Sequence, residues 1–327
     1  MEKRSTLKDI ARSLNLDKST ISLALAGSPK IADKTRDKVR EEAIRLGYRP
    51  NLAARNLSCG NPNTVCLVLS EEFQSIQSEV AAQSIRALAG KAVEAGVLLQ
   101  VISSSDLRRL LQKDSGYPVM PDGLLVWGDV PAEDVTELEG HRLPVVVLDP
   151  NHASYGGWRD ATVRVDNAGG AAAVTSHLLE RNVRRLLFVH VKREHLGHAE
   201  RREAARVLWC SKQSAKTFSS CFLDEITDIL IKEFTANADG AIFCSNDEGA
   251  LQVWQRLMHS GLSLPGQVRL AGFDGILAAN AIGLTTAVFD GSALARAGMD
   301  ILFDKMSDRP AKKRARIPAR LRVGTTT

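Results

Sequence analysis

The chain is 327 residues long, and its 44% hydrophobic and 25% charged residues are typical of a globular protein with two or three domains and a sizeable core. No apolar run reaches the ~18–20 residues of a membrane helix, and the first residues lack the apolar segment of a signal peptide. The positive charge lies at one end: residues 1–60 carry 13 Lys and Arg against 7 Asp and Glu, whereas residues 61–327 carry 30 against 31. This asymmetry favours a polyanionic partner, because phosphate neutralisation releases condensed counterions; a solvated basic face is the alternative for charge alone.

The segment from Thr6 to Gly27 predicts two short helices. Apolar residues follow Thr6 with the i, i+3, i+4, i+7 spacing of one buried helical face, and Asn15 suits the tight turn after them. Asp17 is a good N-cap for the second helix, and Gly27 a good stop. Two short helices joined by a three- or four-residue turn form a helix-turn-helix, whose second helix enters the major groove of DNA.

The second helix has two different faces. Its inner stripe consists of Ile21, Ala24 and Leu25. Four residues point outward: Lys18, Ser19, Ser22 and Leu23. A third helix is expected from about residue 33 to 46, and residues 51–57 form a helical stretch of only about two turns, which is marginal alone in water. Residues 58–63 have the composition of a linker.

After residue 63, short apolar runs alternate with helical segments, which predicts parallel sheets covered on both faces. The strand candidates are residues 64–69, 97–102, 123–127, 144–148, 185–189, 240–244 and 268–273. They form two groups divided near residues 149–166, so we expect two doubly wound lobes with a ligand beyond the carboxyl ends of their strands. The expected α/β chain has three parts: a helix-turn-helix DNA-binding domain at 1–50, a hinge helix and linker at 51–63, and a two-lobe effector-binding and dimerisation core at 64–327.

The head resembles that of the LacI/GalR (lactose-repressor-like) transcription regulators. The resemblance is in order and ungapped, and it rests on Thr6-Leu7-Lys8-Asp9-Ile10-Ala11, Ser19-Thr20-Ile21-Ser22, Thr35-Arg36 and Leu46-Gly47-Tyr48-Arg49-Pro50-Asn51, with Ala54 and Leu57. It implies three groups of DNA-contacting residues: Lys18, Ser19 and Leu23 for base readout, Thr6, Ser22 and Tyr48 for the backbone, and Asn51, Ala54 and Leu57 for a hinge helix in the minor groove. A leucine wedge between base steps kinks DNA.

Leu23 departs from the family pattern, because many members carry Arg at this position. Arg is the best reader of guanine O6 and N7, whereas Leu offers only apolar contact, for instance to a thymine methyl. We therefore expect Lys18 and Ser19 to make the polar base contacts. The alternative is that Leu23 packs against the third helix.

The core resembles the family's effector-binding domain, which is similar to type I periplasmic sugar-binding proteins. The matching motifs are Leu143–Asp149, Val165–Gly170, Cys244–Ala250 and Ala271–Asp274. By resemblance, Asp149, Arg202 and Asp247 line the cleft and bind hydroxyls or carboxylates of an effector, since charged groups can make bidentate hydrogen bonds. The two aspartates follow strands, so capping of the next helix is the alternative.

Two departures bear on the effector. Residues 71–76 replace the Asn-Pro-Phe-Phe type segment common after the first strand. The stretch from 202 to 246 is short and runs straight into a helical segment at 224–234, where the family usually places a further strand and helix, so we expect that strand to be lost or reduced. We therefore keep two hypotheses: a regulator switched by a small effector, of which a sugar is one candidate, and a ligand-independent regulator with a degenerate core.

The sequence offers few other candidates for a metal site or a catalytic site. His190, His195 and His198 lack the helical i, i+4 spacing of a zinc site, and we expect no metal and no cofactor. The basic residues 312–316 are expected to form a solvated loop before a last strand near Leu321. Five cysteines without a C-x-x-C pair favour free thiols in a reducing cytoplasm. With no catalytic or nucleotide-binding motif, the expectation is a cytoplasmic, homodimeric repressor on a pseudo-palindromic double-stranded operator, not an enzyme and not bound to membranes.

Overall fold

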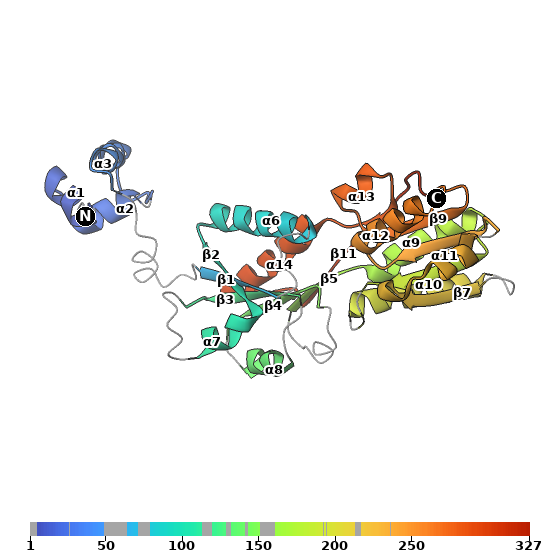
Figure 1. The fold of residues 1–327 in the computed structure, drawn as a ribbon. Helices are drawn as coiled ribbons and strands as arrows, with labels where there is room; N and C mark the ends of the chain where they lie inside the picture. Colours follow the sequence, from blue (N-terminus) through green and yellow to red (C-terminus); the bar gives the residue numbers. More distant parts are fainter. Residues whose placement is uncertain are drawn as a thin grey trace. The chain divides into compact units, whose positions relative to one another are not determined.

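The structure is a computed structural model, drawn in Figure 1. It describes residues 5–25, 27–48, 64–70, 79–112, 120–128, 132–140, 143–150, 161–191, 193, 195–212, 217–235 and 237–327. The chain divides into two compact units, Met1–Asn61 and Pro62–Thr327. In the part of the chain that is described, no helix is long and apolar enough to cross a membrane.

The first unit contains three helices, α1 (Leu7–Leu14), α2 (Lys18–Leu25) and α3 (Asp33–Arg45). They pack around one cluster of buried apolar residues: Ile10, Ile21, Ala24, Val39 and Ala43. Asn15 adopts the left-handed conformation at φ 52°, which turns the chain from α1 into α2, and Gly47 ends α3 at φ 61°. The three helices and the turn predicted from the sequence are confirmed.

The second unit holds two lobes, each built on a six-stranded sheet. The first sheet has the order β11-β5-β4-β3-β1-β2 and is parallel throughout. Its strands are β1 (Thr64–Leu69), β2 (Leu98–Ser103), β3 (Gly123–Trp127), β4 (Val145–Leu148), β5 (Ala161–Val165) and β11 (Arg314–Ile317). One face packs against α6 (Glu79–Ala95) and α14 (Gly291–Met306), and the other against α7 (Leu107–Leu111) and α8 (Ala132–Gly140), as Figure 1 shows.

The second sheet has the order β12-β10-β9-β8-β6-β7, and only the β10–β12 pair is antiparallel. Its strands are β6 (Arg185–His190), β7 (Thr217–Phe222), β8 (Gly240–Cys244), β9 (Val268–Asp274), β10 (Thr285–Val288) and β12 (Arg320–Arg322). One face packs against α9 (Asn167–Glu180) and α10 (Leu196–Ser211). The other packs against α11 (Asp228–Thr235), α12 (Asp247–His259) and α13 (Leu277–Ala281).

The chain crosses between the two sheets at three described places. It leaves the first lobe between β5 and α9, returns between β10 and α14, and leaves again between β11 and β12. Each lobe is therefore assembled from segments far apart in the sequence. The prediction of two doubly wound lobes is confirmed, and the division falls at Asp166, between β5 and α9.

Two sequence predictions about this unit are wrong. The strand expected to be lost or reduced between 202 and 246 is present as β7, and the helical segment expected at 224–234 is present as α11. Residues 312–316 are not wholly a loop, because β11 begins at Arg314; the last strand near Leu321 is confirmed as β12. Both of these strands lie at a sheet edge, where exposed and half-buried residues replace the continuous apolar run of a central strand. The inner strands β5 and β10 were not predicted either, since they are short and contain threonine.

Candidate functional site

The outward face of α2 is exposed as the sequence predicts. Ile21 and Ala24 have no exposed surface, whereas Lys18, Ser19, Ser22 and Leu23 are all exposed. Leu23 is 40% exposed and is not part of the buried apolar cluster that joins the three helices, which favours an outward position over packing against α3. This face offers one ammonium group, two hydroxyls and one apolar side chain to a partner.

Of the backbone-contacting candidates, Ser22 lies on α2, and Thr6 and Tyr48 lie where the start of α1 and the end of α3 are fixed. The N–H and hydroxyl of Thr6 both donate to Asp9 Oδ2, at 2.8 and 2.7 Å, which anchors the start of α1. The ring of Tyr48 packs against the apolar cluster of the head, and this burial raises the pKa of its hydroxyl. The Tyr48 N–H donates to Ala43 O at 2.8 Å, closing the end of α3.

Polar contacts hold α1, α3 and the loop before α3 around α2. Arg36 donates to Ser28 O at 3.3 Å and Ile31 O at 3.0 Å, both in the loop between α2 and α3. Glu42 on α3 accepts from the Ser13 hydroxyl of α1 and from Arg45, and these hydrogen bonds lower the pKa of Glu42 to about 2. The minor-groove candidates Asn51, Ala54 and Leu57 lie outside the described residues.

A buried guanidinium forms the centre of a polar cluster at the carboxyl ends of the core strands. Arg201 on α10 donates to Asn167 Oδ1 at 2.9 Å, to Ser245 O at 2.6 Å and to Asp274 Oδ1 at 3.2 Å. Its guanidinium carbon lies 3.6 Å from the centre of the Phe273 ring. Asn167 follows β5, Ser245 follows β8 and Asp274 is the last residue of β9, so three segments converge on the Arg201 side chain.

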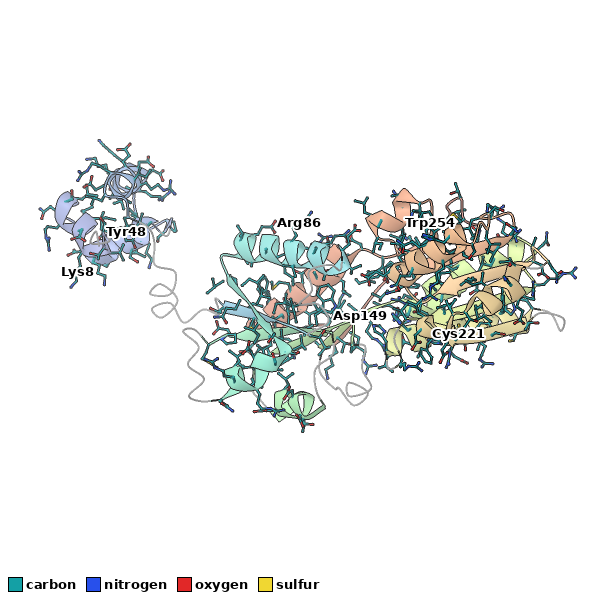
Figure 2. The ribbon with its side chains drawn as sticks, in the orientation of Figure 1. Lys8, Tyr48, Arg86, Asp149, Cys221 and Trp254 are labelled. Carbon is teal, nitrogen blue, oxygen red and sulfur yellow. The ribbon has the colours of Figure 1, made fainter. Side chains whose placement is uncertain are left out.

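Asp149 brings the first lobe into this cluster. It follows β4 with a left-handed φ of 44°, it is buried, and its Oδ1 accepts from Val165 N at 3.1 Å (Figure 2). Burial raises the pKa of Asp149, and the charge of Arg201 opposes that rise. Burial likewise raises the pKa of Asp274 to about 8, with Arg201 again opposing. The cluster thus contains two desolvated carboxylates and one guanidinium, whose positive charge partly offsets the effect of burial.

The other two effector candidates have different surroundings. Asp247 is fully buried and accepts from Thr286 Oγ1 at 2.6 Å, Gly275 N at 2.7 Å and Ile276 N at 3.0 Å, so it fixes the turn after β9. Burial raises its pKa to about 6. The cap of α12 is Asn246, whose Oδ1 accepts from Gly249 N at 2.9 Å. The capping alternative is therefore wrong for Asp247.

Arg202 is the residue after Arg201, whose side chain enters the cluster. It is half-buried, and its Nε has no hydrogen-bond partner among the described residues. Sequence reasoning missed Arg201, Asn167 and Asp274. The signal for Arg201 was the helical spacing with Ala205 and Trp209, since all three are buried on one face of α10.

The histidines lie beside this cluster. His198 Nδ1 is 3.1 Å from the Ser245 hydroxyl, and the rings of His195 and His198 stack at 3.9 Å. Burial lowers the pKa of His190 on β6 to about 4, so it is neutral at physiological pH. The residues that the structure describes include no group of three or more His, Cys, Asp or Glu arranged to hold a metal ion.

Similarities to known proteins follow the same division of the chain. Residues 6–51 match bacterial regulatory proteins of the lacI family, and residues 175–327 match the periplasmic binding protein-like domain. Catabolite control protein A of Staphylococcus aureus (strain MRSA252) is 25% identical over 279 residues, which cover 82% of each protein. The HTH-type transcriptional repressor PurR of Vibrio campbellii (strain ATCC BAA-1116) is 24% identical over 330 residues, covering 95% of this chain and 94% of its own.

A crystal structure of the Lac repressor dimer, bound to operator and the anti-inducer ONPF, shares the fold with a TM-score of 0.80. The two are 18% identical, and 99% of each chain is covered. A helix-turn-helix head with a two-lobed, periplasmic-binding-protein-like core defines a class of DNA-binding transcription regulators. Residues 6–51 are a helix-turn-helix domain of the lacI family of bacterial regulatory proteins, joined to a periplasmic-binding-protein-like domain, and the named relatives are transcription regulators, not enzymes.

Proposed function

We propose that this LacI-family regulator is a cytoplasmic repressor that binds a pseudo-palindromic operator as a homodimer and responds to a small effector held between its lobes. The observation that carries the proposal is the exposed face of α2 on a closed three-helix head. Two-fold symmetry would place one such helix in each half-site. The Lac repressor, whose fold is shared, is bound to operator as a dimer.

In this proposal the exposed residues of α2 divide the recognition of DNA. Lys18 and Ser19 donate to base edges, and Leu23 contacts a thymine methyl. Thr6, Ser22 and Tyr48 bind the phosphate backbone and set the register of the head. Asn51, Ala54 and Leu57 enter the minor groove as a short helix that is stable only on the operator.

For the homodimer we propose a surface on the first lobe formed by α6 and the edge strand β2. Three apolar side chains are exposed there: Val93 at 80%, Leu98 at 43% and Val101 at 49%. Exposed apolar patches of this kind mark interaction surfaces, and an unpaired edge strand is otherwise a liability for aggregation.

For the effector we propose contacts with Asp149, Arg201 and Asp274, and a supporting role for Asp247. Two carboxylates and a guanidinium around one point can bind the hydroxyls of a polyol, so a sugar remains the first candidate. An effector that bridges Asp149 on one lobe and Asp274 on the other would change lobe closure and the spacing of the two hinge segments. The coupling to operator affinity would be about 1–3 kcal/mol.

The test begins with selection of bound duplexes from a random DNA pool by the full chain. A two-fold symmetric consensus is expected, and an asymmetric one would contradict the homodimer. Affinity for that duplex is then measured with a broad panel of sugars and other metabolites. If no compound changes the affinity for DNA, the effector is removed from the proposal and the ligand-independent regulator remains. That alternative was favoured by the expected loss of a strand, which the structure contains as β7.

The minor-groove wedge has its own test. Leu57→Ala should weaken binding to the selected operator while leaving binding to random DNA nearly unchanged, because only the specific complex contains the kink. An equal loss on both duplexes would contradict the wedge.

A further inference from the structure

A hollow of about 560 Å³ opens where the two lobes meet, beside the Arg201 cluster, with which it shares Asn167. The second lobe supplies most of its apolar lining through α9 and α10: Ala168, Ala172, Ala204, Val207 and Leu208. The first lobe supplies Arg164 from β5 and Arg316 from β11. Val207 is 53% exposed although its side chain is apolar. The volume lies within the range of sites for small organic ligands.

Two guanidinium groups, those of Arg164 and Arg316, line one side of this hollow, and a third arginine lies nearby on β11. Arg316 is paired in register with Arg164, and Arg314 lies two residues earlier on the same face of β11. The alternate residues of these strands, including Val165 and Ile317, pack into the core on the other face, so the arginines project away from α14. The Nε of Arg164 is buried without a hydrogen-bond partner in the described parts of the chain.

The acidic groups at the rim already have donors. Glu200 accepts from Arg164 Nη2 at 2.6 Å and from Asn167 Nδ2 at 3.0 Å. Glu203 is paired with Arg206 at 2.7 Å, a hydrogen bond that lowers the pKa of Glu203. The contact between Arg316 and Asp166 is long, at 3.5 Å, and the Arg316 side chain is 69% exposed. Glu200 and Glu203 are thus satisfied within the protein, whereas Arg316 and the Nε of Arg164 keep donors for a ligand.

We propose that this hollow is a second ligand site, which takes a small organic carboxylate with an aliphatic or aromatic body. The apolar body lies between α9 and α10, and the carboxylate accepts from Arg164 Nε and Arg316, because a guanidinium matches a carboxylate in geometry and charge. Such a ligand touches strands of the first lobe and helices of the second.

Asn167 connects this site to the central cluster. Its Oδ1 accepts from Arg201, whereas its Nδ2 donates to Glu200 at the rim of the hollow. A ligand that alters the Arg164–Glu200 contact thus acts on a residue shared with the effector cluster. A ligand shifts the equilibrium between two lobe arrangements when it binds one of them more tightly than the other. By this shift the carboxylate modulates operator binding.

The experiment uses the full chain with three probes, hexanoate, 4-phenylbutyrate and indole-3-acetate, each beside its neutral amide. Calorimetry should show that at least one acid binds about tenfold more tightly than its amide. Arg316→Gln should remove that preference, and Val207→Glu should abolish binding by placing a charge on the apolar wall.

Two variants serve as matched controls. Arg309→Gln removes another exposed arginine with a single acidic partner, and Val323→Glu changes another exposed valine, at 51% against 53% for Val207. Both should bind the acid as the parent does. Equal affinity for acid and amide, unchanged binding in Arg316→Gln, or no binding of any acid at about 10 mM would overturn the proposal.

Discussion

The reading face of α2 and the Arg201 cluster present their chemistry in opposite ways. On α2, the polar groups come from one helix, point into solvent and have few partners of their own. Around Arg201, polar groups from four other segments are buried, and most of their hydrogen-bonding capacity is used within the protein. Substitutions on α2 should therefore change function without stability, whereas substitutions in the cluster should change both.

The largest expected effect is that of Arg201→Met. This change leaves Asn167 Oδ1, Ser245 O and Asp274 without their donor, and it should lower the free energy of unfolding of the core by about 3–5 kcal/mol. Urea unfolding followed by tryptophan fluorescence measures it, because all four tryptophans lie beyond residue 100. Arg202→Met is the matched control and should cost less than half as much. Equal losses would mean that the cluster does not depend on Arg201.

Lys18→Ala should weaken DNA binding without lowering the stability of the fold. Loss of a polar base contact should weaken binding to the selected operator by about 1–3 kcal/mol and relax the preference at one base pair. The melting temperature should not change, since Lys18 is exposed. Fluorescence anisotropy with operator and scrambled duplexes tests this, with Lys34→Ala on the exposed side of α3 as control. A uniform loss on both duplexes would assign Lys18 to the backbone.

A smaller and more specific change is expected for Leu23→Arg. An arginine at this exposed position should create a preference for guanine at one base pair, worth about tenfold in affinity. Leu23→Ala is the companion variant and should lose the preference for thymine without gaining one for guanine. Selection from a random pool reports both outcomes, and an unchanged consensus in Leu23→Arg would remove residue 23 from base readout.

The smallest expected effect concerns pH. Burial raises the pKa of Asp274 to about 8, so the folded state holds a proton that the unfolded state releases near its ordinary pKa of 3.8. The contribution of Asp274 to stability should therefore fall as pH rises from about 4 to 8. Asp274→Asn mimics the protonated acid, so the melting temperature of this variant should match that of the parent near pH 5 and exceed it increasingly toward pH 8.

The exposed Asp308→Asn serves as the control for that series, since Asn tolerates the φ of 51° at this position. It should show no such pH dependence. A constant difference between Asp274→Asn and the parent across the pH range would mean that Asp274 stays ionised, with Arg201 as the dominant influence.

The same contrast explains what the sequence could predict. The faces of α2 follow from helical spacing, a local property, and the most apolar strands, such as β1 and β8, from continuous apolar runs. The inner strands β5 and β10 are short and contain threonine, and they were not predicted. Edge strands such as β7 and β11 lack such runs and were not predicted. Arg201 and Arg202 differ by one helical position, and only the packing of α10 against the sheet decides which of them is buried. Asn167 joins Arg201 across 34 residues, a distance that no local pattern encodes.

The three crossings between the lobes also limit how this chain can be recombined. Residues 64–165 and 291–317 build the first lobe, and residues 167–288 and 320–322 supply strands and helices of the second. Neither lobe is a continuous stretch that can be transplanted alone, whereas the head is. New pairings of signal and target in chimeric regulators should therefore arise by exchange at the junction near residue 61, with the whole core inherited as one module.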